Sequence, residues 1–279
     1  DAKVFYPVTR SGRFMEVKAY FEGEAKEEAQ PHIEEASQKI LECEGFDELE
    51  DILADCATEL LRIAGGEGGK DDIRNVLRGE DFTGDPVAEL RASVAAARGE
   101  RPWTPALAVA LAFRDTYDAV IDRASYGGRH TLGGKDFDAF VSTLERVGFG
   151  PPVESAQIML ELLDEGRIRT ELVARGEEDL RDLAEEVGAT VIIDAVQAPP
   201  GIVEGTLVGN LVEAGIGLRY ADTDALHVKP DATLVGQKHL AAAGRMNEGL
   251  VLGHDTLKRT KQHGIERWAD RVSAAAAEH

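Results

Sequence analysis

The chain has 279 residues, of which 43% are hydrophobic, enough for one large domain or two smaller ones with a buried core. Its 52 acidic residues against 31 basic ones give a formal net charge of -21. A charge of this sign disfavours nucleic acid and anionic membranes as partners, because binding either of them requires a basic face. The ordinary explanation of such a charge is solubility, or an origin in a salty or acidic proteome.

The sequence also argues against a metal centre and a membrane span. The two cysteines, Cys43 and Cys56, have no metal-ligand spacing, and a reducing cytoplasm suits them. No apolar run approaches the roughly 20 residues that a membrane helix needs, and no signal peptide is recognisable. The first residue is Asp1 rather than Met, which is consistent with processing or with a longer parent chain. We therefore expect a cytoplasmic protein.

The first segment, KVFYPVTRSGRFMEVK at 3–18, predicts two strands joined by a turn at Ser11 and Gly12. Arg10 and Arg13 flank this turn, so two guanidinium groups lie at one tip. Arginine pairs bidentately with phosphate, which makes a nucleotide phosphate one candidate partner. A solvated turn is the alternative.

Residues 24–98 are acidic and mostly helical in pattern. Apolar residues recur at helical spacing over 34–64, with a break near Gly45. The glycine-rich run at 65–69 precedes Asp71, which is placed to cap the next helix. We interpret this region as a helical cover or insertion.

Two further helices have clear start or stop signals. Thr104 and Pro105 predict the N-cap and first residue of one helix. The pattern at 153–166 predicts another, which ends at Gly166. Between these two helices, glycine pairs predict tight turns near four side chains that form a candidate pocket for an anionic substrate: Arg123, Tyr126, Arg129 and Arg146. Arginines that tie acidic helices together explain the same pattern equally well.

From residue 167 onward, strand and helix patterns alternate. The run ATVIIDA at 189–195 is continuously apolar, as in the buried strands of a parallel sheet. Helical patterns at 177–187 and 203–214 lie on either side of it. This alternation predicts βαβ units, and therefore an α/β region.

The closing stretch LAAAGRMNEGLVLGHDTL at 240–257 predicts a strand that ends at Gly244, a polar loop, and a long helix capped by Asp255 or Thr256. A loop that delivers backbone N–H groups at a helix start is typical of a phosphate or cofactor rim. Such loops are weak motifs, and a strand, a loop and a capped helix that bind nothing remain the alternative.

GRMNEGLVLGHDTL resembles the closing segment of the FAD/NAD(P)-binding flavoproteins that have two dinucleotide-binding domains. Further segments resemble the same family in the same order: VTRSGRFMEVK, then IDRASYGGR with ERVGFGPP and LLDEGRI, then ATVIIDAVQAPPG. The resemblance implies an α/β fold, namely the C-terminal part of an FAD/NAD(P)-binding Rossmann-like fold with a large helical insertion. It implies three parts: 1–22, a strand-turn-strand of a dinucleotide-binding region; 23–166, a mostly helical cover or insertion; and 167–279, an α/β segment that completes the FAD-binding domain.

The same resemblance implies where cofactors and substrate bind. FAD, and NAD(P)H if the enzyme uses it, are the implied cofactors, and no metal is expected. Arg10 and Arg13 are implied to lie near an NAD(P) phosphate. The four residues of the candidate pocket for an anionic substrate are implied to lie on the substrate side of the flavin. Among the histidines that could act as acid or base, His254 in the flavin-side loop is the best placed, and a structural role at a helix start is the alternative. The residues implied to contact the flavin are Gly244, Arg245, Glu248, Gly249, Gly253, Asp255 and Thr256.

One departure from the family pattern decides the functional expectation. No Gly-x-Gly-x-x-Gly fingerprint occurs in the chain, although a tight FAD site needs that turn to hold the pyrophosphate. We therefore expect a subunit or C-terminal half of an FAD-dependent oxidoreductase that oxidises amines or amino acids or N-oxygenates its substrate. A second chain, or a missing N-terminal segment, would supply the fingerprint, so the assembly is expected to be a hetero-oligomer. The alternatives are a non-catalytic flavoprotein-like partner or regulatory subunit, and an acidic helical scaffold whose glycine loops are only turns.

Overall fold

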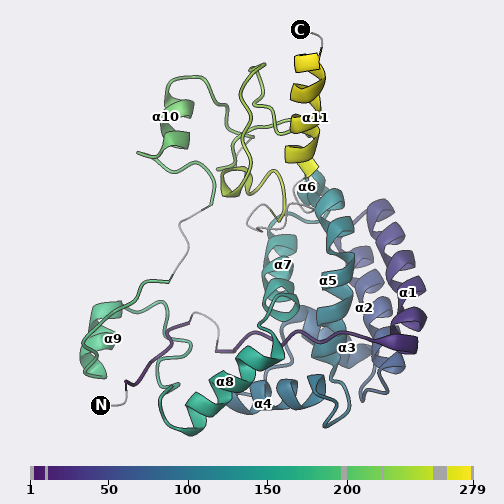
Figure 1. Ribbon diagram of the computed structural model, residues 1–279, viewed down its shortest axis with the longest axis vertical. Coiled ribbons are helices and arrows are strands. Elements are labelled where there is room, and N and C mark those ends of the chain that lie inside the picture. The colour runs from purple at the N-terminus through teal and green to yellow at the C-terminus, as the bar shows by residue number, and fades with distance from the viewer. Residues whose placement is uncertain (1–2, 10–11, 196–199, 222, 254–262, 278–279) are drawn as a thin grey trace. The chain divides into compact units, whose positions relative to one another are not determined.

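A computed structural model describes residues 3–9, 12–195, 200–221, 223–253 and 263–277 (Figure 1). The regular structure of these ranges consists of eleven α-helices and one 3-10 helix. The chain divides into two compact units: unit 1, residues 1–117 with 133–195, and unit 2, residues 118–132 with 196–279.

Unit 1 is a set of helices that pack in pairs. Helix α2 packs against both α1 and α3, helix α7 packs against α3, and α4 packs against α8. Helix α5 begins in unit 1 and ends in unit 2. The helices are α1 (Gly23–Glu42), α2 (Phe46–Ile63), α3 (Lys70–Arg78), α4 (Pro86–Ala97), α5 (Pro105–Ala124), α7 (Lys135–Gly148), α8 (Val153–Asp164) and α9 (Leu180–Glu186).

Helix boundaries in unit 1 follow local signals. The Thr104 hydroxyl accepts a hydrogen bond from the Leu107 N–H at 3.3 Å, which confirms the predicted start of α5. Gly45 separates α1 from α2, as predicted. The cap of α3 differs from the prediction, because Asp72 rather than Asp71 accepts a hydrogen bond from the Gly69 N–H at 2.8 Å. A carboxylate three residues into a helix is the one placed to reach back to the N-cap N–H.

Apolar side chains fill the interior of unit 1. The ring of Phe113 contacts Tyr117 and Phe149 at centroid distances of 5.2 and 5.8 Å. A β-carbon on Gly148 would come within 2.9 Å of the Phe113 ring, so α7 approaches α5 closely at this glycine. A second cluster joins the segment after residue 12 to α4, α5 and α8, and contains Val17, Ala19, Leu90, Val94, Ala96, Leu107, Ala156 and Leu160.

Unit 2 has less regular structure. Its helices are α6 (Gly128–Thr131), α10 (Leu207–Glu213), the 3-10 helix η1 (Arg245–Asn247) and α11 (His263–Ala277). Three antiparallel bridges join Arg219 to Leu226, Val228 to Leu234, and Thr233 to Ala241. The buried core lies beside these bridges and consists of Ala225, Leu226, Val228, Leu234, Leu250 and Val251.

The predicted α/β fold is wrong: the described residues form an all-α structure without a sheet. Strand-type pairing within them is limited to five isolated bridges. Phe5 and Lys18 do not pair with each other but form parallel bridges to Ile168 and Pro152. The run at 189–195 has neither a helix nor a bridge. The physical reason is that a strand needs a neighbouring strand for its backbone hydrogen bonds, whereas a helix makes these bonds within itself.

No helix in the described ranges is long and apolar enough to cross a membrane.

The packing of α8 predicts different effects for two substitutions on that helix. Leu160 is 3% exposed, whereas Ile158 is 58% exposed. Leu160→Ala should lower the free energy of unfolding by about 2–5 kcal/mol, because it leaves a cavity. Ile158→Ala, the matched control, should change it by less than about 0.5 kcal/mol. Urea denaturation measures both, and similar losses for the two variants would contradict this packing.

Candidate functional site

The turn after α5 and the closing loop contact each other in unit 2. The Tyr126 N–H donates to the Leu250 carbonyl at 2.7 Å, and the Leu252 N–H donates to the Ser125 hydroxyl at 3.3 Å. These residues are more than 120 positions apart in the sequence. The structure therefore brings two predicted groups together: the substrate-side residues near Tyr126 and the flavin-side residues near Glu248.

The turn itself is tight and strained. Tyr126 and Gly127 both have positive φ, of 55° and 105°. A β-carbon on Gly128 would lie 1.8 Å from the Arg123 carbonyl oxygen, so only glycine fits there. The Arg123 guanidinium donates to the Thr131 hydroxyl at 2.9 Å, across α6. A left-handed residue other than glycine costs on the order of 1 kcal/mol, and such strain is common at functional sites.

Two charged side chains approach each other beside this turn. The Arg129 Nη1 atom lies 3.9 Å from the Glu248 Oε1 atom, and the two side chains are 17% and 25% exposed. The Tyr126 hydroxyl lies 3.5 Å from the Lys229 carbonyl oxygen. Burial raises the pKa of the Tyr126 phenol, which therefore stays a neutral hydrogen-bond donor around pH 7. A cation beside a carboxylate is suited to recognising a small polar molecule that carries both charges.

The structure describes the predicted strand-to-helix rim only up to Gly253, because the helix start at Asp255 or Thr256 lies outside the described residues. Gly244 has a φ of 110° and leads into η1 rather than ending a strand. Gly249 (φ 101°) packs against Ala225, and Gly253 (φ 75°) follows a buried apolar run. These positive φ values explain why glycine stands at all three positions.

The loop also uses its own backbone N–H groups. The Asn247 N–H donates to the Gly244 carbonyl at 3.0 Å, and the Glu248 N–H donates to the Arg245 carbonyl at 3.1 Å. The N–H groups of Leu250 and Val251 both donate to the Asn247 carbonyl at 3.0 Å. These four donors are therefore engaged within the loop rather than directed at a phosphate.

Arg10, His254, Asp255 and Thr256, which the sequence analysis singled out, lie outside the described residues.

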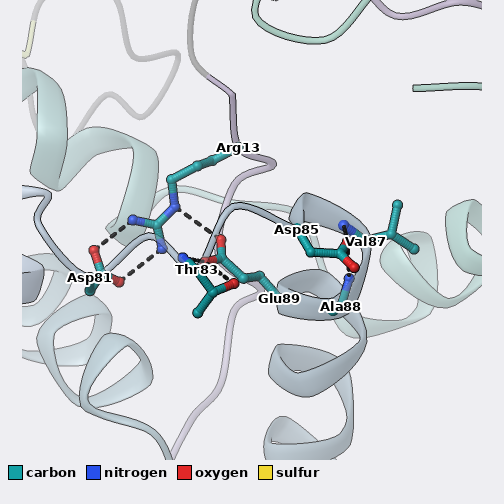
Figure 2. A network of polar contacts seen from close by, with 7 residues as sticks. All are labelled: Arg13, Asp81, Thr83, Asp85, Val87, Ala88 and Glu89. Carbon is teal, nitrogen blue, oxygen red and sulfur yellow. Dashed lines mark hydrogen bonds and ion pairs between the residues drawn. The ribbon is translucent and has the colours of Figure 1, made fainter. Parts of the chain in front are cut away.

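Arg13 lies in unit 1 and is held by two carboxylates (Figure 2). Its Nη1 and Nη2 atoms donate to the two Asp81 oxygens at 2.5 and 2.8 Å, and its Nε atom donates to Glu89 at 3.1 Å. The Arg13 side chain is only 11% exposed. The other Glu89 oxygen accepts hydrogen bonds from the N–H and hydroxyl of Thr83, and Asp85 caps α4 beside it. Arg13 therefore ties the N-terminal segment to the connection between α3 and α4.

Arg146 belongs to the same charged cluster and not to unit 2. Burial, and then the positive charge of Arg13, lower the pKa of Arg146. The Arg146 carbonyl accepts a hydrogen bond from the Glu16 N–H at 3.3 Å. The structure thus places Arg146 with Arg13, while the other three substrate-side residues are in unit 2.

Glu16 is a titratable group that the sequence analysis missed. Burial raises the pKa of its carboxyl to about 7, against the opposing effects of the Ser93 hydrogen bond and the Arg13 charge. Its Oε1 atom is buried and has no hydrogen-bond partner among the described residues. Nothing local in the sequence signals this environment, because Ser93, Asp81 and Arg146 come from distant elements.

A polar groove of about 410 Å³ lies in unit 1 beside α2 and α3. Ion pairs of 2.6 Å between Arg74 and Asp51 and of 2.7 Å between Arg78 and Glu50 cross it. No group of three or more metal-ligating side chains occurs in the described part of the chain. The full lining is Asp47, Glu50, Asp51, Asp71, Arg74, Asn75 and Arg78. The groove is thus explained by helix-to-helix ion pairing.

Comparison of the chain with protein-family models, with curated proteins and with solved structures found no match. The resemblance to FAD/NAD(P)-binding flavoproteins therefore depends only on the sequence segments quoted above. Any functional proposal has to be argued from the residues that the structure brings together.

The Arg13 cluster predicts unequal costs for removing two arginines. Arg13→Leu leaves Asp81 and Glu89 without their partner in a poorly solvated site, and should cost roughly 3 kcal/mol of unfolding free energy. Arg91→Leu breaks an exposed pair with Asp164, in which the side chains are 52% and 59% exposed. This control should cost less than about 1 kcal/mol. Equal losses in urea denaturation would contradict the structural role of Arg13.

The raised pKa of Glu16 predicts that this group destabilises the fold as pH rises. The native state keeps a proton that the unfolded state, with the ordinary value of 4.5, releases between pH 4.5 and about 7. The stability due to this group is therefore complete below pH 4.5 and decreases up to about pH 7, by at most about 1.4 kcal/mol per pH unit.

Glu16→Gln removes this titration and leaves the facing charges of Arg13, Asp81 and Arg146 in place. The variant should gain stability relative to the wild type as pH rises, and the difference should level off above about pH 7. Urea denaturation across this pH range measures the difference. A difference that does not change with pH would show that Glu16 titrates normally.

Proposed function

We propose that the chain is one component of an FAD-dependent oxidoreductase whose cofactor site is completed by a second chain or segment that carries the Gly-x-Gly-x-x-Gly fingerprint. The supporting observation is the contact in unit 2 between the turn at Tyr126 and the loop at Leu250. The resemblance assigned these two segments separately to the substrate side and the flavin side of one site. The proposal requires no dinucleotide-binding fold within this chain.

The described residues suit the substrate side of such a site better than the side that holds the FAD pyrophosphate. Four amides in the described part of the closing loop are engaged within the loop, so these four do not bind the pyrophosphate. The Arg129 and Glu248 pair instead suits the substrate side. FAD supplies hydride-transfer chemistry when bound, and the protein contributes position and electrostatics.

The Arg129 and Glu248 pair favours an amino acid as substrate. A guanidinium beside a carboxylate is complementary to the carboxylate and ammonium groups of a zwitterion. The Arg129 Nη1 and Glu248 Oε1 atoms lie 3.9 Å apart, and a bound zwitterion would replace this ion pair with one ion pair to each side chain. Arg129 would bind the substrate carboxylate, and Glu248 would bind the ammonium group. Use of NAD(P)H is supported by the resemblance alone, because Arg13 is engaged by Asp81 and Glu89.

The proposal is tested on the complex purified without refolding, with every co-purifying chain identified. A yellow complex that contains a fingerprint chain and oxidises L-amino acids, with oxygen or NAD(P)+ as acceptor, is the expected result. Arg129→Gln should lower kcat/KM roughly tenfold to a hundredfold, the value of a lost charge-assisted hydrogen bond. Arg91→Gln is the control and should leave kcat/KM unchanged. A colourless complex that does not bind added FAD would contradict the proposal.

A second candidate is a non-catalytic partner of a flavoprotein. The internal hydrogen bonding of the closing loop favours it, because a cofactor rim would need those N–H groups. In this case the partner flavoprotein would bind FAD by itself and would oxidise its substrate at the same rate with or without this chain. Arg129→Gln would then have no effect on kcat/KM, which distinguishes the two candidates.

A further inference from the structure

Residues 13–18 lie against the helices of unit 1 and are held there by their backbone. The Glu16 N–H donates to the Arg146 carbonyl at 3.3 Å, and the Lys18 N–H donates to the Pro151 carbonyl at 3.0 Å. The two acceptors belong to the last turn of α7 and to the short connection between α7 and α8. These main-chain bonds would break if the segment moved away from the helices.

The same segment also contacts α4. The Val17 N–H donates to the Ser93 hydroxyl at 3.2 Å, and the Val17 side chain is completely buried. A β-carbon on Gly150 would lie 1.6 Å from the Glu16 carbonyl oxygen, so the two backbones approach closely at this glycine. Glu16 therefore lies in the middle of a segment that the core holds on both sides.

The charges around Glu16 balance only when its carboxyl carries a proton. The Arg13 guanidinium is bound by both Asp81 and Glu89 (Figure 2). Arg146, on α7, supplies a second positive charge to the same cluster. Two cations and two carboxylates are thus matched before Glu16 is counted, and its ionisation would add an excess negative charge.

The unpaired oxygen of Glu16 supports the same conclusion. The Glu16 Oε1 atom is buried and has no hydrogen-bond partner among the described residues, while the Ser93 hydroxyl of α4 bonds the carboxyl. Burying an unpaired oxygen costs more free energy in a carboxylate than in a neutral acid. An ionised Glu16 side chain would gain water as a partner only if the segment left its place.

We propose that residues 13–18 act as a pH-sensitive latch: the protonated Glu16 side chain keeps this segment on α4 and α7, and loss of the proton releases it. The carboxyl has a pKa of about 7 when the segment is in place and the ordinary value of 4.5 when it is released. Release therefore becomes easier as pH rises from 4.5 to about 7 and then stops changing.

Contacts that follow the latch limit how far the release spreads. The Arg114 guanidinium of α5 donates to the Ala19 carbonyl at 2.6 Å. The ring of Phe21 stacks on Trp103, with the ring centroids 4.7 Å apart. Neither contact includes Glu16, so residues 19–21 should stay on the core while 13–18 opens locally.

The inference goes beyond the proposed function. All the residues of the latch belong to unit 1, whereas the candidate site belongs to unit 2. The latch requires no flavin, and the failure of one proposal leaves the other standing.

Hydrogen exchange of the full chain between pH 5 and 8, resolved to single amides by NMR, tests the latch. The amides of Glu16, Val17 and Lys18 report opening of the segment, and amides inside α2 report global unfolding. Protection at the three reporter amides, corrected for the intrinsic exchange rate, should fall roughly fortyfold from pH 5 to 7 and level off above about pH 7. Low concentrations of urea should lower protection in α2 but hardly at the reporter amides, because a local opening exposes little surface.

Three variants separate the latch from a general effect of charge. Glu16→Gln mimics the protonated acid, so the reporter amides should stay protected from pH 5 to 7. Glu27→Gln removes an exposed acid of α1 and, as the control, should behave like the wild type. Ser93→Ala removes a hydroxyl that favours the ionised carboxyl, so the fall in protection should continue to higher pH than in the wild type.

Protection at 16–18 that does not change with pH would overturn the proposal, and so would the same fall in Glu16→Gln as in the wild type. Reporter amides that match those of α2 in both protection and urea dependence would also overturn it, because the segment would then leave its place only when the whole unit unfolds.

Discussion

Every buried backbone N–H and C=O group needs a hydrogen-bond partner. This constraint determines which parts of the chain form regular secondary structure. A helix meets it within its own residues, so α1 to α5 and α7 to α8 form wherever an apolar stripe can be buried. A strand meets it only with a neighbour. In the described residues that neighbour is present for single residues such as Phe5 and Val228, and never for a full strand.

The sequence predicted those features whose cause is local. The start of α5 at Thr104 and the break at Gly45 depend on residues within one turn, and the structure confirms both. The sequence did not predict the partners of Arg13, because Asp81 and Glu89 are 68 and 76 positions away along the chain. The prediction of an α/β fold was wrong for the same reason. The run at 189–195 has strand composition, but pairing depends on distant segments that composition does not reveal.

The candidate site shows the same difference between features with a local cause and features that depend on distant residues. The sequence picked out Tyr126, Arg129 and Glu248 as residue types, and the structure brings them to one turn through backbone contacts between distant segments. It also shows that Arg13 and Arg146 share a charged cluster with Glu16 in unit 1. The glycines of the closing loop have a conformational reason in their positive φ, which their spacing alone did not distinguish from a phosphate rim.

The central claim is that the described part of this chain is helical and that its best strand-forming segment, 189–195, pairs with no other strand. Hydrogen exchange of the free chain, resolved to short peptides, tests that claim most directly. We predict that amides at 190–193 exchange nearly as fast as in an unfolded peptide, while amides in the interior of α2 and α5 exchange slowly because opening them requires unfolding. Protection at 190–193 comparable to that of α2 would show that the chain builds a sheet of its own, and would contradict the account.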